Sequence, residues 1–156
     1  GDHRDLHTAY RRQRQMCIRD RPALAGMKSL SRLDLSESQV GDEGLASLKE
    51  LTSLTDLNLW ATQVTDAGLE NLSQLTGLTK LNLDQTGVSD DGLKHVGKLT
   101  ALKALVLRST QITDDGVSHL FTLKDLEDLN VEFCSSLGDS GKQAIRDNLS
   151  SVVITE

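Results

Sequence analysis

Histidine and cysteine are the side chains in this sequence with the most obvious chemistry, because both bind metals and cysteine is also a nucleophile. His3 and His7 are four residues apart, as two ligands on one helix turn would be, but no glutamate completes an HExxH motif. His95 and His119 lie 24 residues apart. They could form a surface metal site or a pH-sensitive pair, but a metal would need a third or fourth ligand and none is evident, so a variable solvent-facing position is favoured. We therefore expect no metal site.

Catalytic motifs are equally sparse. Serine and aspartate are plentiful, but none combines with a histidine at a spacing that suggests a Ser/His/Asp triad. The glycines occur singly, whereas a phosphate-binding loop needs a glycine-rich cluster. We expect this chain to be neither an enzyme nor a cofactor-binding protein.

The elements that would position any site follow a strict internal repeat. The segments LSRLDL, LTDLNL, LTKLNL, LKALVL and LEDLNV begin at residues 30, 54, 78, 102 and 126, always 24 residues apart. Within each segment apolar and polar residues alternate, which predicts a short strand. The following segment, such as TDAGLENLSQL, has leucines three residues apart, as on one face of a helix. The chain is therefore predicted to repeat a strand and a helical turn.

The junction between strand and helix also repeats. An apolar residue that should turn inward occurs at Val40, Val64, Val88 and Ile112. Three hydroxyl residues, Thr65, Ser89 and Thr113, are predicted to act as helix N-caps. A carboxylate is predicted in the first turn of each of four helices, from Asp42, Asp66, Asp90 and Asp114. Glycine returns two residues after each of these aspartates, although glycine inside a helix costs about 1 kcal/mol. This regular return predicts a place where a side chain would collide with the neighbouring repeat.

The LxxLxL segment followed by TxVTDxGLxxLxxL resembles the leucine-rich repeat family, in the subtype with Thr or Cys where other members have Asn. The fifth repeat reads CSSLGDSG, is one residue longer, and is similar to cysteine-containing repeats. The resemblance implies an α/β solenoid, with parallel strands on a concave face and helices or turns on a convex face. Stacked repeats would bury one continuous leucine core. Cys134, at the inward corner that threonine occupies in other repeats, should be a buried structural residue of low reactivity.

The expected organisation is a repeat domain over 22–156, preceded by a basic segment over 1–21 that lacks the repeat. Residues 149–154 match LxxLxL again, through Leu149, Val152 and Ile154, and predict a short terminal strand. The fragment QMCIRDR resembles translated adapter sequence, so we expect part or all of 1–21 to be foreign to a protein that extends further upstream. The alternative is a native basic arm. Such an arm can bind nucleic acid or anionic lipid, but a charge cluster of this size is usually solvated, so neither is expected as a partner.

Charge and composition exclude several partners of the repeat domain. The net charge of −6 divides into +3 over residues 1–21, with six Arg and three Asp, and −9 over the remainder, with eleven basic and twenty acidic residues. An acidic body argues against nucleic acid. No apolar run approaches the roughly 20 residues of a membrane helix. Two cysteines do not make a disulfide framework, which favours the cytoplasm; secretion would need a signal upstream of this fragment.

Binding is expected on the strand side chains that point away from the core. The second outward row, Asp34, Asn58, Asn82, Val106 and Asn130, is nearly uniform and could bond along the strands. The third row, Ser36, Trp60, Asp84, Arg108 and Glu132, varies most, as a recognition surface should. Tryptophan and arginine are enriched at interface hot spots. The predicted partner-binding residues are Trp60, Lys80, Asp84, Val106, Arg108, Glu132 and Phe133, against the alternative of scattered surface residues.

The sequence thus favours a non-catalytic module, a fragment of a longer bacterial protein, that binds another protein of unspecified identity. Two alternatives remain open: the substrate-recognition arm of a ubiquitin-ligase-like adaptor or secreted effector, and a regulatory appendage of an enzyme. Only half a repeat precedes Leu30, so the N-terminal end should expose a strand edge. Self-association through that end is a further expectation.

Overall fold

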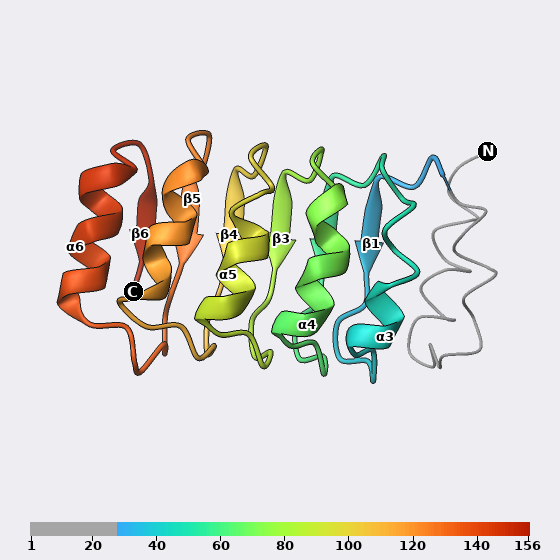
Figure 1. The fold of residues 1–156 in the computed structure, drawn as a ribbon, viewed down its shortest axis with the longest axis horizontal. Helices are drawn as coiled ribbons and strands as arrows, with labels where there is room; N and C mark the ends of the chain where they lie inside the picture. Colours follow the sequence, from blue (N-terminus) through green and yellow to red (C-terminus); the bar gives the residue numbers. More distant parts are fainter. Residues whose placement is uncertain (1–27) are drawn as a thin grey trace.

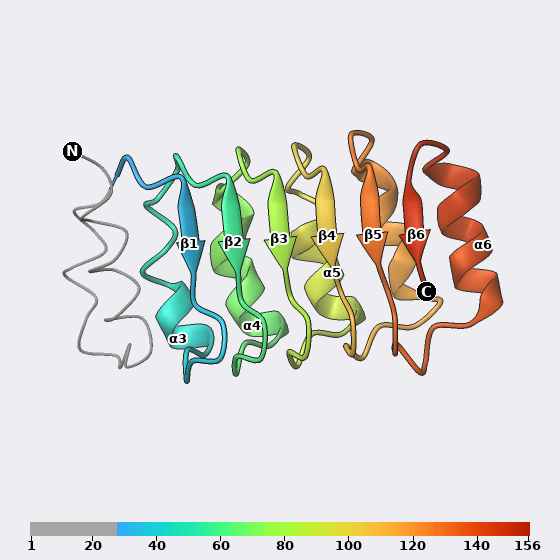
Figure 2. The same cartoon turned by 180° about the vertical axis from the view of Figure 1, so that it is seen from behind.

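The computed structural model describes residues 28–156 and shows a row of repeats, each a short strand followed by a helical segment (Figure 1). The strands form one parallel sheet in chain order: β1 (Arg32–Asp34), β2 (Asp56–Asn58), β3 (Lys80–Asn82), β4 (Ala104–Val106), β5 (Asp128–Asn130) and β6 (Val153–Thr155). Figure 2 shows the sheet from its open side, with the helices behind it. The α/β solenoid implied by the resemblance to leucine-rich repeats is therefore confirmed.

The helical segments are short and mixed in type. They are α3 (Asp42–Leu45), α4 (Asp66–Leu69), the 3₁₀ helix η2 (Glu70–Gln74), α5 (Asp90–Val96), the 3₁₀ helix η3 (Gly116–Thr122) and α6 (Asp139–Asn148). The three-residue spacing of the apolar positions suits the 3.0 residues per turn of a 3₁₀ helix. Each segment can therefore bury its apolar side chains against the sheet without forming a long α-helix.

The sheet register converts the sequence period into a stack. Leu33, Leu57, Leu81 and Leu105 each lie beside their equivalent in the next strand. The repeated leucines and the corner residue of each repeat are buried in one continuous core. A solenoid of this kind is stable only as a stack, because one repeat cannot bury its apolar face alone.

The last strand corrects one sequence-based prediction. Strand β6 spans Val153–Thr155 instead of 149–154. Ile154 pairs with Leu129, whereas the LxxLxL alignment matched Ile154 with Val131. The extra residue of the fifth repeat and the ten-residue helix α6 delay the strand. Leu149 is buried as the first residue after that helix and belongs to no strand.

The helix starts confirm one part of a prediction and correct another. Thr65 and Ser89 occupy the predicted N-cap positions, but neither hydroxyl makes a capping bond to its own helix. Instead the carboxylate of Asp42, one repeat earlier, accepts hydrogen bonds from the Thr65 amide (2.8 Å) and hydroxyl (2.6 Å). Asp66 binds Ser89 in the same way, at 2.7 and 2.5 Å. The carboxylates predicted to serve their own helix therefore hold the next repeat.

We call Asp42, Asp66, Asp90 and Asp114 the aspartate ladder. Asp90 binds the amide and hydroxyl of Thr113 at 2.8 and 2.7 Å. Asp114 binds only the amide of Gly138, at 2.6 Å, because glycine has no hydroxyl. The recurring glycines make room for the ladder. A Cβ on Gly141 would lie 2.6 Å from Asp114 Oδ1, and Cβ atoms on Gly68, Gly92 and Gly116 would meet the preceding aspartates even more closely. The predicted collision with the neighbouring repeat is confirmed for Gly68, Gly92 and Gly116, whereas a Cβ on Gly44 would meet Val40 of its own repeat.

Several expectations concern residues outside the described part of the chain. These are the basic segment 1–21, the pair His3 and His7, and the half-repeat before residue 28. The expected open N-terminal end and self-association through it stay predictions for the same reason.

Candidate functional site

The candidate site is the row of side chains that directly follows the strands on the open side of the sheet. We call this exposed side the sheet face; it corresponds to the concave face expected from the sequence. The parallel register places equivalent residues of neighbouring repeats beside one another, as the bond from the Ala61 amide to the Asp84 carbonyl (2.9 Å) illustrates. We call Ser36, Trp60, Asp84, Arg108 and Glu132 the third row.

A backbone bend that the sequence did not predict follows the third row. Five residues, one in each repeat, have positive φ between 52° and 58°: Glu37, Ala61, Gln85, Ser109 and Phe133. None is glycine, although a left-handed conformation costs other residues about 1–2 kcal/mol. The chain turns at these positions from the sheet toward the core, where the side chain of the following residue is buried.

The second row explains how this bend is held. Asp34, Asn58, Asn82 and Asn130 each accept a hydrogen bond from the amide two residues later, at 2.9–3.1 Å. The asparagine row therefore stabilises turns within each strand end and does not bond from strand to strand as considered above. Val106 interrupts the row and has no side-chain acceptor to offer the amide of Arg108.

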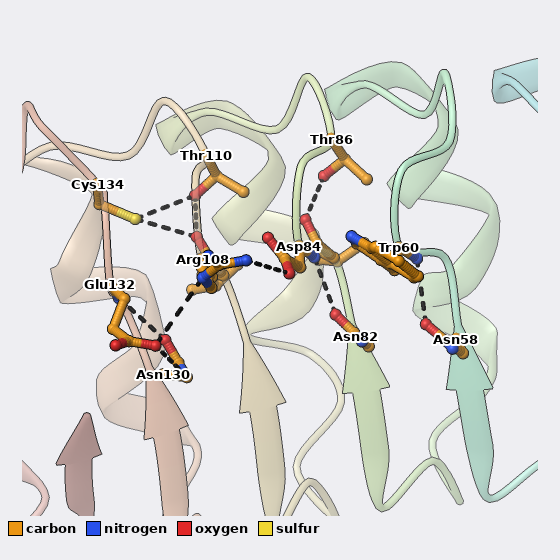
Figure 3. A network of polar contacts seen from close by, with 12 residues as sticks. Asn58, Trp60, Asn82, Asp84, Thr86, Arg108, Thr110, Asn130, Glu132 and Cys134 are labelled. Atoms are coloured by element: carbon orange, nitrogen blue, oxygen red, sulfur yellow. Dashed lines mark hydrogen bonds and ion pairs between the residues drawn. The ribbon is translucent and has the colours of Figure 1, made fainter. Parts of the chain in front are cut away.

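Arg108 connects the third row. Its Nη1 donates to Asp84 Oδ2 at 3.1 Å, and its Nε lies 3.9 Å from Glu132 Oε2 (Figure 3). The guanidinium carbon lies 4.8 Å from the centre of the Phe133 ring, in a cation–π contact. Asn130 Nδ2 donates to the same Glu132 oxygen at 3.0 Å. Side chains from three neighbouring repeats therefore form one cluster.

Trp60 and Asp84 extend this cluster toward β2. Trp60 was predicted to point at solvent, but it is half-buried, and its indole Nε1 is buried without a hydrogen-bond partner. Asp84 is only 9% exposed, and its Oδ1 likewise lacks a partner. Figure 3 shows the indole ring extending toward Asp84. A buried donor and a buried acceptor left unpaired in one row are costly in a folded protein, by about 1–3 kcal/mol each.

The other predicted residues occupy different places on the sheet face. Phe133 is 71% exposed. Its backbone is left-handed, which is rare for a bulky side chain. Val106 is half-buried in β4, one row before Arg108. Lys80 is exposed at the start of β3, before Asn82 and Asp84 of the same repeat. None of the contacts described above includes it. The cluster therefore comprises Trp60, Asp84, Arg108, Glu132 and Phe133; we call it the third-row cluster.

The histidine pair and Cys134 lie elsewhere. His95 and His119 are half-buried on the helical side, in α5 and η3. A hydrogen bond from Lys94 lowers the pKa of Asp91 below its usual value, and the charges of the two histidines add a smaller contribution. Among residues 28–156 no group of three His, Cys, Asp or Glu side chains could hold a metal ion.

Cys134 is buried, as predicted, and its thiol donates to the carbonyl of Leu107 in the preceding repeat at 3.0 Å. Thr62, Thr86 and Thr110 instead donate to the carbonyl three residues earlier in their own repeat. This corner is structural in every repeat, so neither it nor the histidine pair adds to the site on the sheet face.

Comparison with known proteins agrees with the repeat. A family model for the leucine-rich repeat matches residues 26–49 and 98–121. The structure is similar to internalin C2 from Listeria monocytogenes, at 29% sequence identity and a TM-score of 0.69, over 85% of this chain and 54% of that one. Residues 26–49 and 98–121 therefore match leucine-rich repeats, and the fold is that of leucine-rich repeat proteins.

Two more distant solved structures share the fold. An internalin (inlF) from Listeria monocytogenes is 24% identical, with a TM-score of 0.73, over 87% of this chain and 37% of that one. The plant peptide hormone receptor RGFR1, solved in complex with RGF2, is 20% identical, with a TM-score of 0.58, over 82% and 20%. This chain thus spans about half or less of the length of these proteins. A search of curated proteins gives no match. No helix within residues 28–156 has the length and apolar character needed to cross a membrane.

Proposed function

We propose that the sheet face binds a segment of another protein and that the chain acts as a non-catalytic interaction scaffold. One observation carries this proposal: the third-row cluster brings together an exposed aromatic ring, a stacked arginine and two unpaired polar atoms on the open side of a regular scaffold. Aromatic residues and arginine contribute strongly to binding hot spots. Groups that cost stability in the free protein are expected where a partner supplies the missing contacts.

The proposal also agrees with the division of labour in the repeat. The inward positions are repeated almost unchanged and are buried, so they serve the core. The third row carries a different residue in each repeat, as specific recognition requires. One protein of the same fold, the plant receptor RGFR1, is described in complex with the peptide hormone RGF2. The adaptor and appendage alternatives would place the same binding surface in a longer protein.

A displayed library of random short peptides provides the test. We expect the wild-type protein to select peptides, and the double variant Trp60→Ala/Arg108→Ala to lose them while keeping its fold. Lys49→Ala/Gln74→Ala, which changes two exposed residues on the helical side, is the matched control and should bind as the wild type does. If the selected peptides bind the sheet-face variant unchanged, the sheet face is not the binding surface.

A further inference from the structure

Hydrogen-bonding capacity in the third-row cluster is unevenly distributed. Arg108 is its cation, and that guanidinium already bonds Asp84, approaches Glu132 and stacks on Phe133. By contrast, Asp84 is only 9% exposed, and its Oδ1 has no hydrogen-bond partner. At Glu132 the hydrogen bond from Asn130 and the approach of Arg108 both involve Oε2, so Oε1 is available. The cluster therefore has spare acceptors, and Trp60 Nε1 is the buried donor in it that lacks a partner.

This distribution changes the role expected for Arg108. An arginine held by two carboxylates and one ring is poorly placed to receive an acidic group of a partner. Its fork and its flat face instead fix the positions of Asp84, Glu132 and Phe133 relative to one another. Arg108 is thus a positioning residue, and the groups that meet the partner are the carboxylates and the aromatic rings.

The wider sheet face has the same charge bias. Its outward side chains are the second row, the third row, the strand residues two positions before the second row, and the five left-handed residues after the third row. They include three basic residues and twice as many acidic ones: Arg32, Lys80 and Arg108 against Asp34, Glu37, Asp56, Asp84, Asp128 and Glu132. Charge complementarity across an interface speeds association and disfavours wrong partners. An acidic surface around an exposed phenylalanine fits a cationic segment that also carries apolar or aromatic side chains, since cations bind both carboxylates and ring faces.

We propose that the sheet face recognises a basic, extended peptide segment of its partner, whose Lys or Arg donors bond Asp84 and Glu132 while its apolar side chains pack on Phe133. This inference rests on the proposed function and specifies its ligand. Asp84 Oδ1 is covered in the free protein, and the Trp60 ring lies on the side toward it (Figure 3). A partner donor reaches that oxygen once the Trp60 ring turns aside. Binding should therefore change the fluorescence of Trp60, the only tryptophan in the sequence.

Selection from a random-peptide display library tests the charge of the ligand directly. We expect the enriched peptides to be richer in Lys and Arg than the unselected library, and their affinity, followed by Trp60 fluorescence, to fall with added salt. Asp84→Asn/Glu132→Gln should weaken their binding by about tenfold or more. Glu50→Gln/Glu70→Gln removes the same charge from exposed positions on the helical side and should leave binding unchanged.

The single variant Glu132→Gln keeps the test valid if the double variant folds poorly, because Glu132 is partly exposed; its loss of affinity should be smaller but measurable. Arg108→Lys separates positioning from contact. This variant keeps the positive charge but loses the planar guanidinium, so it should weaken the binding of basic peptides. If the positive charge itself contacted an acidic ligand, that ligand would still bind the variant.

The outcomes distinguish the two proposals. Enrichment of acidic or neutral peptides that still need Trp60 and Phe133 would overturn the basic-ligand inference and keep the sheet face as the binding site. Equal loss in the sheet-face and helical-side charge variants would mean non-specific attraction to an acidic protein, and would also overturn the inference. Failure to select any peptide would count against the proposed function itself.

Discussion

The two ends of each strand-to-helix junction use polar groups in opposite ways. On the helical side, the aspartate ladder repeats one residue type, and its oxygens bind the next repeat at 2.5–2.8 Å. On the sheet face, the third row changes residue type in every repeat and leaves Trp60 Nε1 and Asp84 Oδ1 unpaired. The comparison indicates that the uniform, hydrogen-bonded carboxylates of the ladder hold this solenoid together, while the varied third row keeps two unpaired atoms for a partner to bond.

The largest expected effect comes from filling the space that the ladder needs. Gly116→Ala places a Cβ against the carboxylate of Asp90, which must then release Thr113. We expect a loss of about 3 kcal/mol in the free energy of unfolding, from overpacking and broken hydrogen bonds. Urea denaturation measures this loss.

Gly77→Ala is the matched control, because its Cβ would come no closer than 3.7 Å to the carbonyl oxygen of Thr52. Its unfolding midpoint should stay near that of the wild type. Equal effects of the two substitutions would remove the ladder from the account.

A second prediction compares two members of the ladder. Asp66→Ala removes two hydrogen bonds to Ser89, whereas Asp114→Ala removes one bond to Gly138. We expect losses of about 2 and about 1 kcal/mol in the free energy of unfolding, respectively. Urea midpoints of the two variants, measured together, give the difference. An Asp114→Ala variant less stable than Asp66→Ala would contradict a ladder whose strength follows its hydrogen bonds.

Sequence reasoning succeeded where residue type and spacing decide the feature. The period, the inward leucines, the burial of Cys134 and the glycines that approach the neighbouring repeat all follow from them. It was wrong about two specific partners across repeats: the aspartate carboxylates were assigned to their own helices, and Ile154 was aligned with Val131. Local pattern does not fix which side chains meet, or in which register, between stacked repeats.

The same limit applies to the candidate site, where the sequence predicted the positions of residues but not the contacts between their side chains. Alternation identified the third row, including Trp60, Asp84 and Arg108, but not that Arg108 is held between two carboxylates. That contact requires the side-chain conformations. One signal was present in the sequence. Each repeat has an asparagine or aspartate two residues before the third row, except the repeat in which Val106 occupies that position. Asparagine and aspartate side chains at such positions typically stabilise a turn.

The third prediction uses that exception on the sheet face. Val106→Asn restores the acceptor for the amide of Arg108 and should stabilise the protein by about 0.5 kcal/mol, the low end for one hydrogen bond. The same change should weaken binding of the selected peptides, because a polar group replaces an apolar one inside the binding surface. Asn82→Val, its mirror image in β3, should lower the unfolding midpoint. If Val106→Asn lowered the unfolding midpoint as Asn82→Val does, the missing acceptor at Val106 would not reduce the stability of the wild type.

The smallest expected effect lies at the C-terminal end. Hydrogen bonding to Lys142 and the charge of Arg146 lower the pKa of Glu156 below its usual value. A lowered pKa in the folded state means that the contribution to stability is present above the unfolded pKa and lost as pH falls through the folded one. Hydrogen exchange of the β6 amides should therefore accelerate, relative to β3, as the solution is acidified through that range. Glu156→Gln should remove the pH dependence of this difference.

The central claim is that the third row of the sheet face is where a partner binds. Amide chemical-shift mapping of the ¹⁵N-labelled protein during titration with a selected peptide tests it most directly. The account predicts that the largest shifts lie in residues 58–62, 82–86, 106–110 and 130–134, with the helix starts that contain the aspartate ladder almost unchanged. Chemical-shift changes concentrated at the helix starts, with the third-row amides unchanged, would contradict this claim.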